Sequence, residues 1–247
     1  MRIVWHPFNS AHYSVEPALM CAGEPPGPPL RITATWSVLE HPRGAVVIDT
    51  GAPPGDPDAE MPHGGDVVSR LASIGIAPRD VHYVVNTHLH VDHVGGNRAL
   101  EGARFLVDGA EVDFARAPDD PVLAAEYSLE LVAPDRLDYE RLPDGDVDLF
   151  GDGAAVLLTT PGHAVGHRSV LLRLPLSGSV LVAGDAVWMR ANLAEDTLPG
   201  LLWSASAYRR SRRRLRRLAE TERARWFFSH DPGSFGEKGW QEGGTYY

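Results

Sequence analysis

A short histidine-rich segment has the residue types and spacing that best suit metal-ion chemistry. It reads Thr87-His88-Leu89-His90-Val91-Asp92-His93 and is followed by a Gly-Gly pair. Side chains two residues apart face the same way in an extended segment, so His88 and His90 can converge on one cation. Asp92 and His93 lie where the chain turns into a helix, and they point to a neighbouring spot. One loop can therefore supply ligands to two metal ions.

The alternative interpretation is that these histidines cluster by chance, since the chain contains 11 of them. Chance clustering does not easily place three histidines within six positions, with an aspartate between them, after an apolar run and before Gly-Gly. We therefore interpret the segment as a metal site.

Three further candidate ligands follow β-like runs elsewhere in the chain: His163, Asp185 and His230. Each is a weak signal alone, but together they complete the ligands that two metals need. The single cysteine, Cys21, excludes an intramolecular disulfide and a thiolate cluster. Imidazole and carboxylate ligands suit Zn, Mn, Fe or Co. We expect two divalent metal ions, with Zn²⁺ as the first choice.

The remaining pattern predicts the elements that position these side chains. Strands are expected at residues 32–39, 45–49, 81–86, 104–107, 147–150, 155–159, 169–174, 180–183 and 225–229. Helices are expected at residues 66–74, 110–115, 122–131 and 206–220. Loops are expected at residues 5–30 and 51–64. This order suits two packed sheets with helices outside, and the lack of an obvious linker predicts a single domain over residues 1–247.

The bulk composition restricts the partners and the compartment. With 43% hydrophobic and 23% charged residues, the chain resembles an ordinary globular protein. Its formal net charge of -10 argues against binding nucleic acid or an anionic membrane. No stretch approaches the roughly 20 apolar residues that cross a bilayer. The first residues, Met-Arg-Ile-Val-Trp-His-Pro, lack the apolar region of a signal peptide, so we expect a cytoplasmic protein.

A run of arginines marks the predicted helix at residues 206–220. Its basic residues are Arg209, Arg210, Arg212, Arg213, Arg214, Arg216 and Arg217. We interpret the helix as a solvated face, with Tyr208, Leu215 and Leu218 turned inward. RNA binding is the functional alternative, which the acidic balance disfavours. Contact with an acidic partner subunit also stays open, and a homodimer is one option.

The histidine-rich segment and the later ligands together resemble the metallo-β-lactamase superfamily. Residues 88–93 match its HxHxDH motif, and the order of the later ligands matches as well. The resemblance implies an α+β fold, an αββα sandwich of two mixed β-sheets with helices on the outer faces. It implies one metal on His88, His90 and His163, a second on Asp92, His93 and His230, and Asp185 bridging both. Asp49 would orient the loop, and His167 would be structural or hydrogen-bonded behind His163.

Within this superfamily the chain is most similar to the N-acyl homoserine lactonase branch. The similarity rests on residues 86–97, on the segment from Thr160 to His167, and on Phe228-Ser229-His230-Asp231. It implies a dinuclear metal-dependent hydrolase that opens a lactone or related carboxylic ester by attack of a metal-bridging hydroxide. Asp92 would be catalytic, both as a ligand and as acceptor of a hydrogen bond from that hydroxide. The expected partner is a small-molecule ester or lactone.

One residue departs from that branch, where a tyrosine commonly follows the bridging aspartate by three positions and contacts the substrate carbonyl. Here the position holds Trp188, whose indole N–H can donate a hydrogen bond but cannot act as an acid. It could instead pack against an apolar substrate. Phe8 and Met20, in the predicted loop 5–30, are candidates for the same pocket wall, with ordinary loop packing as the alternative.

Other activities compete with lactone opening. A thioesterase of the glyoxalase II type would use the same ligands, but no basic C-terminal substrate domain is obvious. A β-lactamase is disfavoured because a signal peptide is not seen, and a nuclease is disfavoured by the charge. A non-catalytic metal-binding regulatory protein is the alternative outside enzymes. The complete ligand set argues against it, because members that lose activity usually lose ligands.

Overall fold

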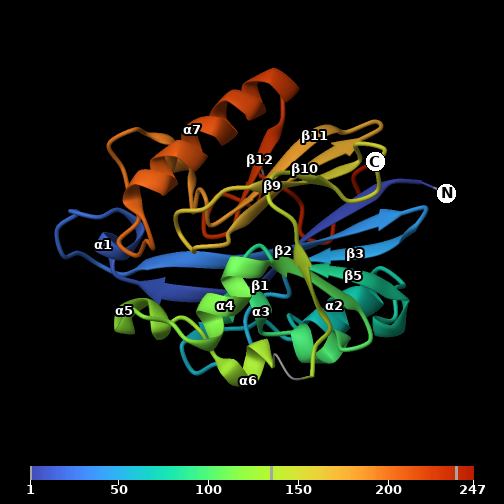
Figure 1. Cartoon of the computed structure of the whole chain (residues 1–247), viewed down its shortest axis with the longest axis horizontal. Helices are drawn as coiled ribbons and strands as arrows, with labels where there is room; N and C mark the ends of the chain where they lie inside the picture. The colour runs from blue at the N-terminus through green and yellow to red at the C-terminus, as the bar shows by residue number, and fades with distance from the viewer. Residues whose placement is uncertain (1, 134–135, 237–238) are drawn as a thin grey trace.

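The computed structural model describes residues 2–133, 136–236 and 239–247, and it contains two β-sheets packed face to face (Figure 1). The larger sheet has the strand order β4-β1-β2-β3-β5-β6-β7. Its strands are β1 (Val4–Val15), β2 (Leu30–His41), β3 (Gly44–Ile48), β4 (Ala59–Glu60), β5 (Val81–Val85), β6 (Arg104–Asp108) and β7 (Tyr139–Leu142). Strand β2 pairs with β1 and with β3 in antiparallel fashion. From β3 through β5 and β6 to β7, neighbouring strands are parallel.

The smaller sheet has the order β12-β11-β10-β9-β8. Its strands are β8 (Val147–Asp148), β9 (Ala155–Thr159), β10 (Arg168–Leu174), β11 (Gly178–Gly184) and β12 (Arg225–Phe228). Strand β12 is parallel to β11, and the other neighbours are antiparallel. Both sheets are therefore mixed, as the sequence predicts.

Helices cover the outer face of each sheet (Figure 1). The described helices are α1 (Pro17–Met20), α2 (Val67–Ser73), α3 (Val91–Val94), α4 (Gly109–Arg116), α5 (Pro121–Ala124), α6 (Leu129–Val132) and α7 (Ala205–Glu222). Short 3-10 turns occur at Pro78–Asp80, Asn97–Leu100 and Arg190–Leu193. Helices α2, α3, α4 and α6 lie on the side of the larger sheet, and α7 crosses the smaller sheet. This arrangement confirms the predicted αββα sandwich.

Alternation along the strands explains the layers. Val46 and Ile48 point into the core between the two sheets, and Val47 between them points to the helices under the larger sheet. Leu172 likewise faces the core between the sheets, whereas Leu171 packs under α7. Because successive side chains alternate across a strand, a strand buried on both faces is apolar at every position.

The predicted loop at residues 5–30 is wrong over its first half. Residues Val4–Val15 form β1, which pairs with β2 along its length. The apolar signal is masked because the strand contains His, Pro, Asn and Ser. Pro7 is tolerated because it faces away from β2 toward the C-terminal segment, where its carbonyl accepts from the Gly243 N–H at 2.8 Å and no N–H of its own is needed. The second half of the predicted loop includes the Pro- and Gly-rich residues 23–29, which lie in the connection between α1 and β2.

The predicted helix at residues 122–131 is two short helices instead of one. Asp120 caps α5, and Ser128 caps a new start at α6. Between them, the backbone carbonyl of Glu126 accepts a hydrogen bond from the N–H of Val91, at 3.0 Å. The break therefore ties this segment to the histidine-rich loop.

Among the described helices, none combines the length and apolar character needed to cross a membrane.

Candidate metal centre

The seven predicted ligands come together at one edge of the two sheets. His88 and His90 follow β5, and Asp92 and His93 lie on α3. The remaining ligands follow strands of the smaller sheet: His163 after β9, Asp185 after β11 and His230 after β12. The centre thus lies between the sheets and depends on loops from both.

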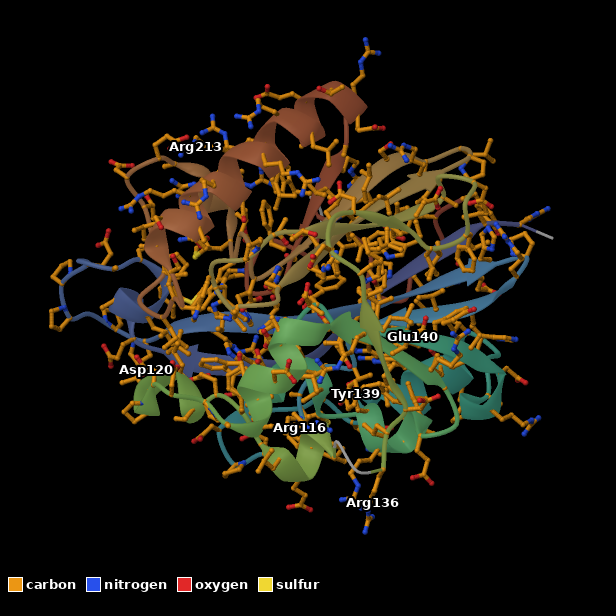
Figure 2. The ribbon with its side chains drawn as sticks, viewed as in Figure 1. Arg116, Asp120, Arg136, Tyr139, Glu140 and Arg213 are labelled. Atoms are coloured by element: carbon orange, nitrogen blue, oxygen red, sulfur yellow. The ribbon has the colours of Figure 1, made fainter. Side chains whose placement is uncertain are left out.

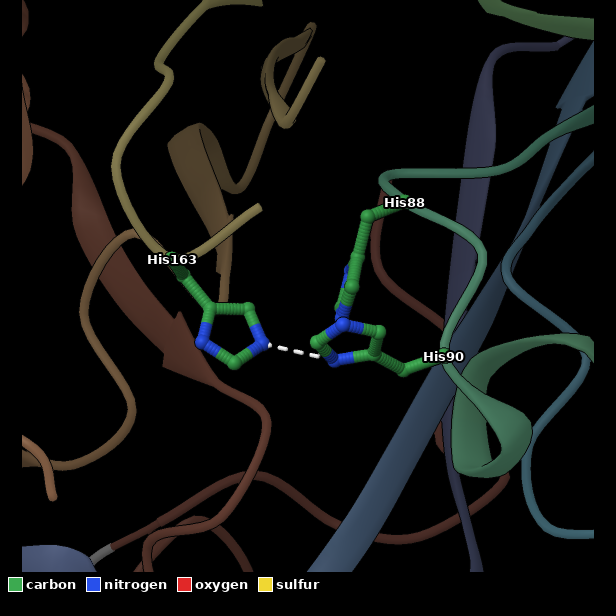
Figure 3. A group of neighbouring side chains, drawn as sticks. All are labelled: His88, His90 and His163. Carbon is green, nitrogen blue, oxygen red and sulfur yellow. Dashed lines mark hydrogen bonds between the residues drawn. The ribbon is translucent and has the colours of Figure 1, made fainter. Parts of the chain in front are cut away.

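The first set of ligands is His88, His90 and His163, whose ligand atoms lie within 4.8 Å of one another (Figure 3). His90 Nδ1 and His163 Nε2 are 2.9 Å apart, although His90 follows a strand of the larger sheet and His163 follows a strand of the smaller sheet. His163 Nδ1 lies 3.3 Å from the Leu201 carbonyl, which can only accept, so that nitrogen carries the proton. The bare Nε2 therefore faces the cluster.

The second set is Asp92, His93 and His230, and it meets the same distance limit. His93 Nδ1 lies 2.8 Å from Asp49 Oδ2, and His230 Nδ1 donates to the Thr33 carbonyl at 2.8 Å. In both histidines Nε2 therefore points into the cluster. Hydrogen bonds at the outer nitrogen hold metal-binding imidazoles in this way.

Asp185 lies between the two sets. Its Oδ2 is 3.2 Å from His163 Nε2 and 3.1 Å from His230 Nε2, and its Oδ1 is 3.3 Å from His93 Nε2. It also forms a compact group with His88 and His93. A carboxylate in this position can contact cations on either side.

Two buried nitrogens in the cluster test whether cations fit there. His88 Nε2 and His93 Nε2 are buried and make no well-directed hydrogen bond among the described residues, although Asp185 Oδ1 lies 3.3 Å from His93 Nε2. A buried polar atom without a partner is unfavourable, and native structures rarely leave one. One of these two unpaired nitrogens belongs to each ligand set, and a divalent cation would use its lone pair. The residues present therefore fit a centre with two cations.

Electrostatics differ between the sets. Burial, together with the neighbouring histidines, holds the pKa of His88 and of His90 well below the ordinary value, and burial also lowers the pKa of His163. Burial opposes protonation of His93 too, but Asp92, Asp185 and Asp49 outweigh it and hold its pKa well above the ordinary value.

Two residues outside the ligand sets fix the loops. Asp49 has a left-handed φ of 57°, and its carboxylate accepts from the Thr87 N–H at 2.7 Å and the Thr87 hydroxyl at 2.8 Å. His167 Nε2 accepts from the Asp185 N–H at 2.8 Å, and burial lowers its pKa to about 3. His167 thus supports Asp185, and the described contacts show no hydrogen bond from it to His163.

A pocket opens onto the centre. Its floor includes His90, Asp92, His163, Asp185 and His230. Its walls are Tyr13, Val15, Leu19, Ile32, Val91, Glu126, Trp188 and Leu201. Apart from Glu126 and the Tyr13 hydroxyl, which donates to Asp56, the walls are apolar. Such a pocket suits a ligand with a reactive polar group and an apolar extension.

The three predicted wall residues have different positions. Trp188 lines the pocket and packs edge-on against His163 and His230, with centroid distances of 5.1 and 5.4 Å. Met20 is fully buried behind Trp188. Phe8 stacks on Trp36 in the core under the larger sheet and is not among the lining residues. The structure thus favours the packing alternative for Phe8, because β1 turns its side chain away from the pocket.

The arginines of helix α7 are exposed or half-buried, with one exception. Tyr208 and Leu215 are buried as predicted, and Arg213 lies on the outer side of α7 (Figure 2). Arg212 is the exception, since it is fully buried and donates to the backbone carbonyls of Asn192, Thr197 and Glu195. It thereby ties α7 to the segment that leads from Trp188 to Leu201. Its position in a run of arginines gives no sign of this role.

Comparisons with known proteins agree with the fold and the centre. A sequence model of the metallo-β-lactamase superfamily matches residues 31–223, and the chain belongs to this superfamily. The N-acyl homoserine lactonase AttM of Azorhizobium caulinodans is 32% identical over 226 residues, which cover 85% of this chain and 86% of that protein. The N-acyl homoserine lactonase AiiA of Bacillus thuringiensis subsp. kurstaki is 30% identical over 235 residues, which cover 89% and 88%.

Solved structures give the same relationship. A quorum-quenching N-acyl homoserine lactone hydrolase is 26% identical, with a TM-score of 0.88 over 100% of this chain and 99% of that one. Another N-acyl homoserine lactone hydrolase, with N-hexanoyl-L-homoserine bound at its catalytic metal centre, gives a TM-score of 0.82 at 26% identity over 94% and 95%. The chain is therefore related over its whole length to metal-dependent lactone hydrolases.

Proposed function

We propose that this protein is a dinuclear metal-dependent hydrolase that opens lactones or related carboxylic esters. The observation that carries the proposal is the buried His/Asp cluster at the floor of an apolar pocket. Each ligand set in this cluster contains one buried nitrogen without a well-directed hydrogen bond, His88 Nε2 in the first and His93 Nε2 in the second. The relatives described above, which are lactonases, support the substrate class. N-acyl homoserine lactones are the first substrates to test.

The ligand roles follow the two sets. His88, His90 and His163 would hold one divalent cation, and Asp92, His93 and His230 the other, with Asp185 in contact with both. Two such cations, most simply Zn²⁺, lower the pKa of water and stabilise negative charge that develops on the carbonyl and leaving oxygens. Asp185 is itself held by His167 and by the Ser229 hydroxyl at 2.5 Å from Oδ1. The chain thus fixes the carboxylate that lies between the two ligand sets.

Asp92 is the catalytic residue in this proposal. Its side chain is 19% exposed, whereas that of Asp185 is 3% exposed, and it lines the pocket. Its carboxylate is therefore placed to accept a hydrogen bond from the attacking water and to orient it toward the substrate carbonyl. Asp185 also lines the pocket, but its carboxylate is more deeply buried and is held by His167 and Ser229.

Trp188 would position the substrate. Its indole packs against one histidine of each ligand set and forms part of the apolar wall. Its Nε1 is buried and has no partner among the described residues. The side chain therefore offers an apolar face to an acyl group and one free donor to a polar substrate atom.

The experiment loads purified protein with zinc, manganese or cobalt and follows acid release on lactones, thioesters and β-lactams. We expect turnover of lactones, lost in Asp92→Asn while both metals stay bound. Turnover of thioesters alone would assign the protein to the glyoxalase II type. Two bound metals without turnover of any substrate would contradict the proposal and favour a metal-binding regulatory protein.

A further inference from the structure

A fully buried carboxylate lies behind the first ligand set. Glu111 lies in the first turn of α4 and is 0% exposed. Its Oε1 accepts from the Leu89 N–H at 3.1 Å, and its Oε2 accepts from the Gly166 N–H at 2.9 Å. Both oxygens are thus engaged with backbone of other elements, and neither is used by the reaction proposed above.

The two backbone groups belong to the two loops that carry the first ligand set. Leu89 stands between His88 and His90, after β5 of the larger sheet. Gly166 stands three residues after His163, in the loop that follows β9 of the smaller sheet. The loops approach α4 closely, since a Cβ on Gly166 would lie 2.7 Å from the Glu111 Cβ. One carboxylate therefore links the two sheets where their ligands meet.

A third contact leads from Glu111 to His90 itself. The Tyr127 hydroxyl donates to Glu111 Oε1 at 2.8 Å, and the Tyr127 ring packs edge-on against His90 with a centroid distance of 4.7 Å. No hydrogen bond connects Glu111 to Asp92, His93 or His230 among the described residues. The hydrogen bonds of Glu111 therefore reach the surroundings of the first ligand set and not the side chains of the second.

We propose that Glu111 is a positioning residue that sets the spacing of His88 and His90 relative to His163, and so the metal affinity of the first ligand set. The inference rests on the proposed metal centre. A carboxylate with one oxygen on each loop holds both at fixed distance, because a charged acceptor makes stronger hydrogen bonds to N–H groups than a neutral one. Changes behind metal ligands typically weaken affinity by about 10- to 100-fold.

The test measures zinc affinity of the full chain by titration calorimetry, one ligand set at a time. His230→Ala disables the second set and leaves the first, whereas His163→Ala does the reverse. Glu111→Gln is added to each. It keeps the size of the side chain but turns an NH₂ group toward one backbone N–H. We expect zinc affinity to fall about 10- to 100-fold in the His230→Ala background and to stay nearly constant in the His163→Ala background.

A matched control separates positioning from general stability. Val112→Ala, at the next residue of α4, removes buried apolar packing and leaves the Glu111 contacts in place. It should lower the thermal midpoint while sparing zinc affinity in the His230→Ala background. An equal fall in zinc affinity with Val112→Ala, or an equal fall in both backgrounds with Glu111→Gln, would overturn the inference.

A second variant allows the test even if Glu111→Gln does not fold. Tyr127→Phe removes only the hydroxyl that donates to Glu111 and keeps the ring against His90. We expect a smaller fall in zinc affinity, confined to the His230→Ala background, and no change there would overturn the inference. The readout is independent of turnover, so selective weakening without lactone hydrolysis would refute only the proposed substrate. Absence of zinc binding in the parent chain would refute the metal centre and the inference together.

Discussion

The two ligand sets share one carboxylate but have different surroundings. His88, His90 and His163 are three buried imidazoles whose pKa values are all lowered. The second set contains Asp92, whose carboxylate lies 3.8 Å from His93 Nε2 and 3.6 Å from His230 Nε2, and His93 also has the Asp49 carboxylate behind it. For His230, burial opposes protonation, but Asp185 and Asp92 outweigh it and raise the pKa.

This difference shows that one cluster can offer two unequal metal positions. In the first set the imidazoles are neutral at neutral pH and can bind a cation directly. In the second set the nearby carboxylates raise the pKa of both imidazoles, so a cation competes with protons there over a wider pH range. The negative charge that attracts a second cation is therefore the same charge that attracts its competing protons.

The largest expected effect comes from the residue shared by both sets. Asp185→Ala should weaken zinc at both positions by more than about 100-fold, because changes behind the ligands alone cost about 10- to 100-fold. Lactone turnover should be lost as well. Elemental analysis after dialysis checks the metal content, with His163→Ala as the comparison that should weaken chiefly the first position. Two zinc ions retained by Asp185→Ala would contradict its shared role.

A smaller and selective effect is expected from Asp49→Asn. The substitution removes the carboxylate behind His93, and asparagine tolerates the left-handed backbone that residue 49 adopts. Zinc affinity of the second set should fall about 10- to 100-fold, and more than that of the first set. Calorimetry in the His163→Ala and His230→Ala backgrounds measures each. An equal fall in both would show that Asp49 acts mainly through Thr87, which is next to His88.

Proton release should also distinguish the two positions. The pKa of His93 is raised, so zinc competes with a proton in the second set up to a higher pH, and its affinity there rises as pH rises toward that pKa. The pKa values of the first set are lowered, so zinc there releases almost none. Titration of the single-set variants in two buffers of different ionisation enthalpy should show that zinc releases more protons from the second set than from the first. Equal release from both sets would remove the proposed difference.

The sequence predicts the floor of the pocket far better than its wall. His88, His90 and Asp92 are close in sequence, so their spacing alone indicates a shared target. His163 and His230 follow strands, which indicates that they lie at the same edge. The order of strands and helices likewise predicts the two-sheet fold, which the structure confirms.

The wall depends on contacts that leave little trace in sequence. Strand β1 is hidden by its polar residues, so the side chains that β1 turns toward the pocket or away from it could not be assigned in advance. Glu111 is one glutamate in a short helix, and only the tertiary fold shows that both its oxygens accept from ligand loops. A buried polar residue of this kind is identified by its partners, which lie 22 and 55 positions away in the chain.

The smallest expected effect on the metals belongs to the wall, at Trp188. Trp188→Phe keeps an apolar face against His163 and His230 but removes the free Nε1 donor. Zinc affinity should stay nearly constant, while kcat/KM for lactones falls by no more than about tenfold, the effect of a modest change in a hydrophobic pocket. Kinetics on lactones of increasing acyl length then separate the two roles of the indole. A loss that is uniform across chain lengths indicates the donor, whereas a loss that grows with chain length indicates the apolar face. A marked loss of zinc affinity would instead show that Trp188 holds the ligand histidines in place, so that the pocket wall contributes to metal binding.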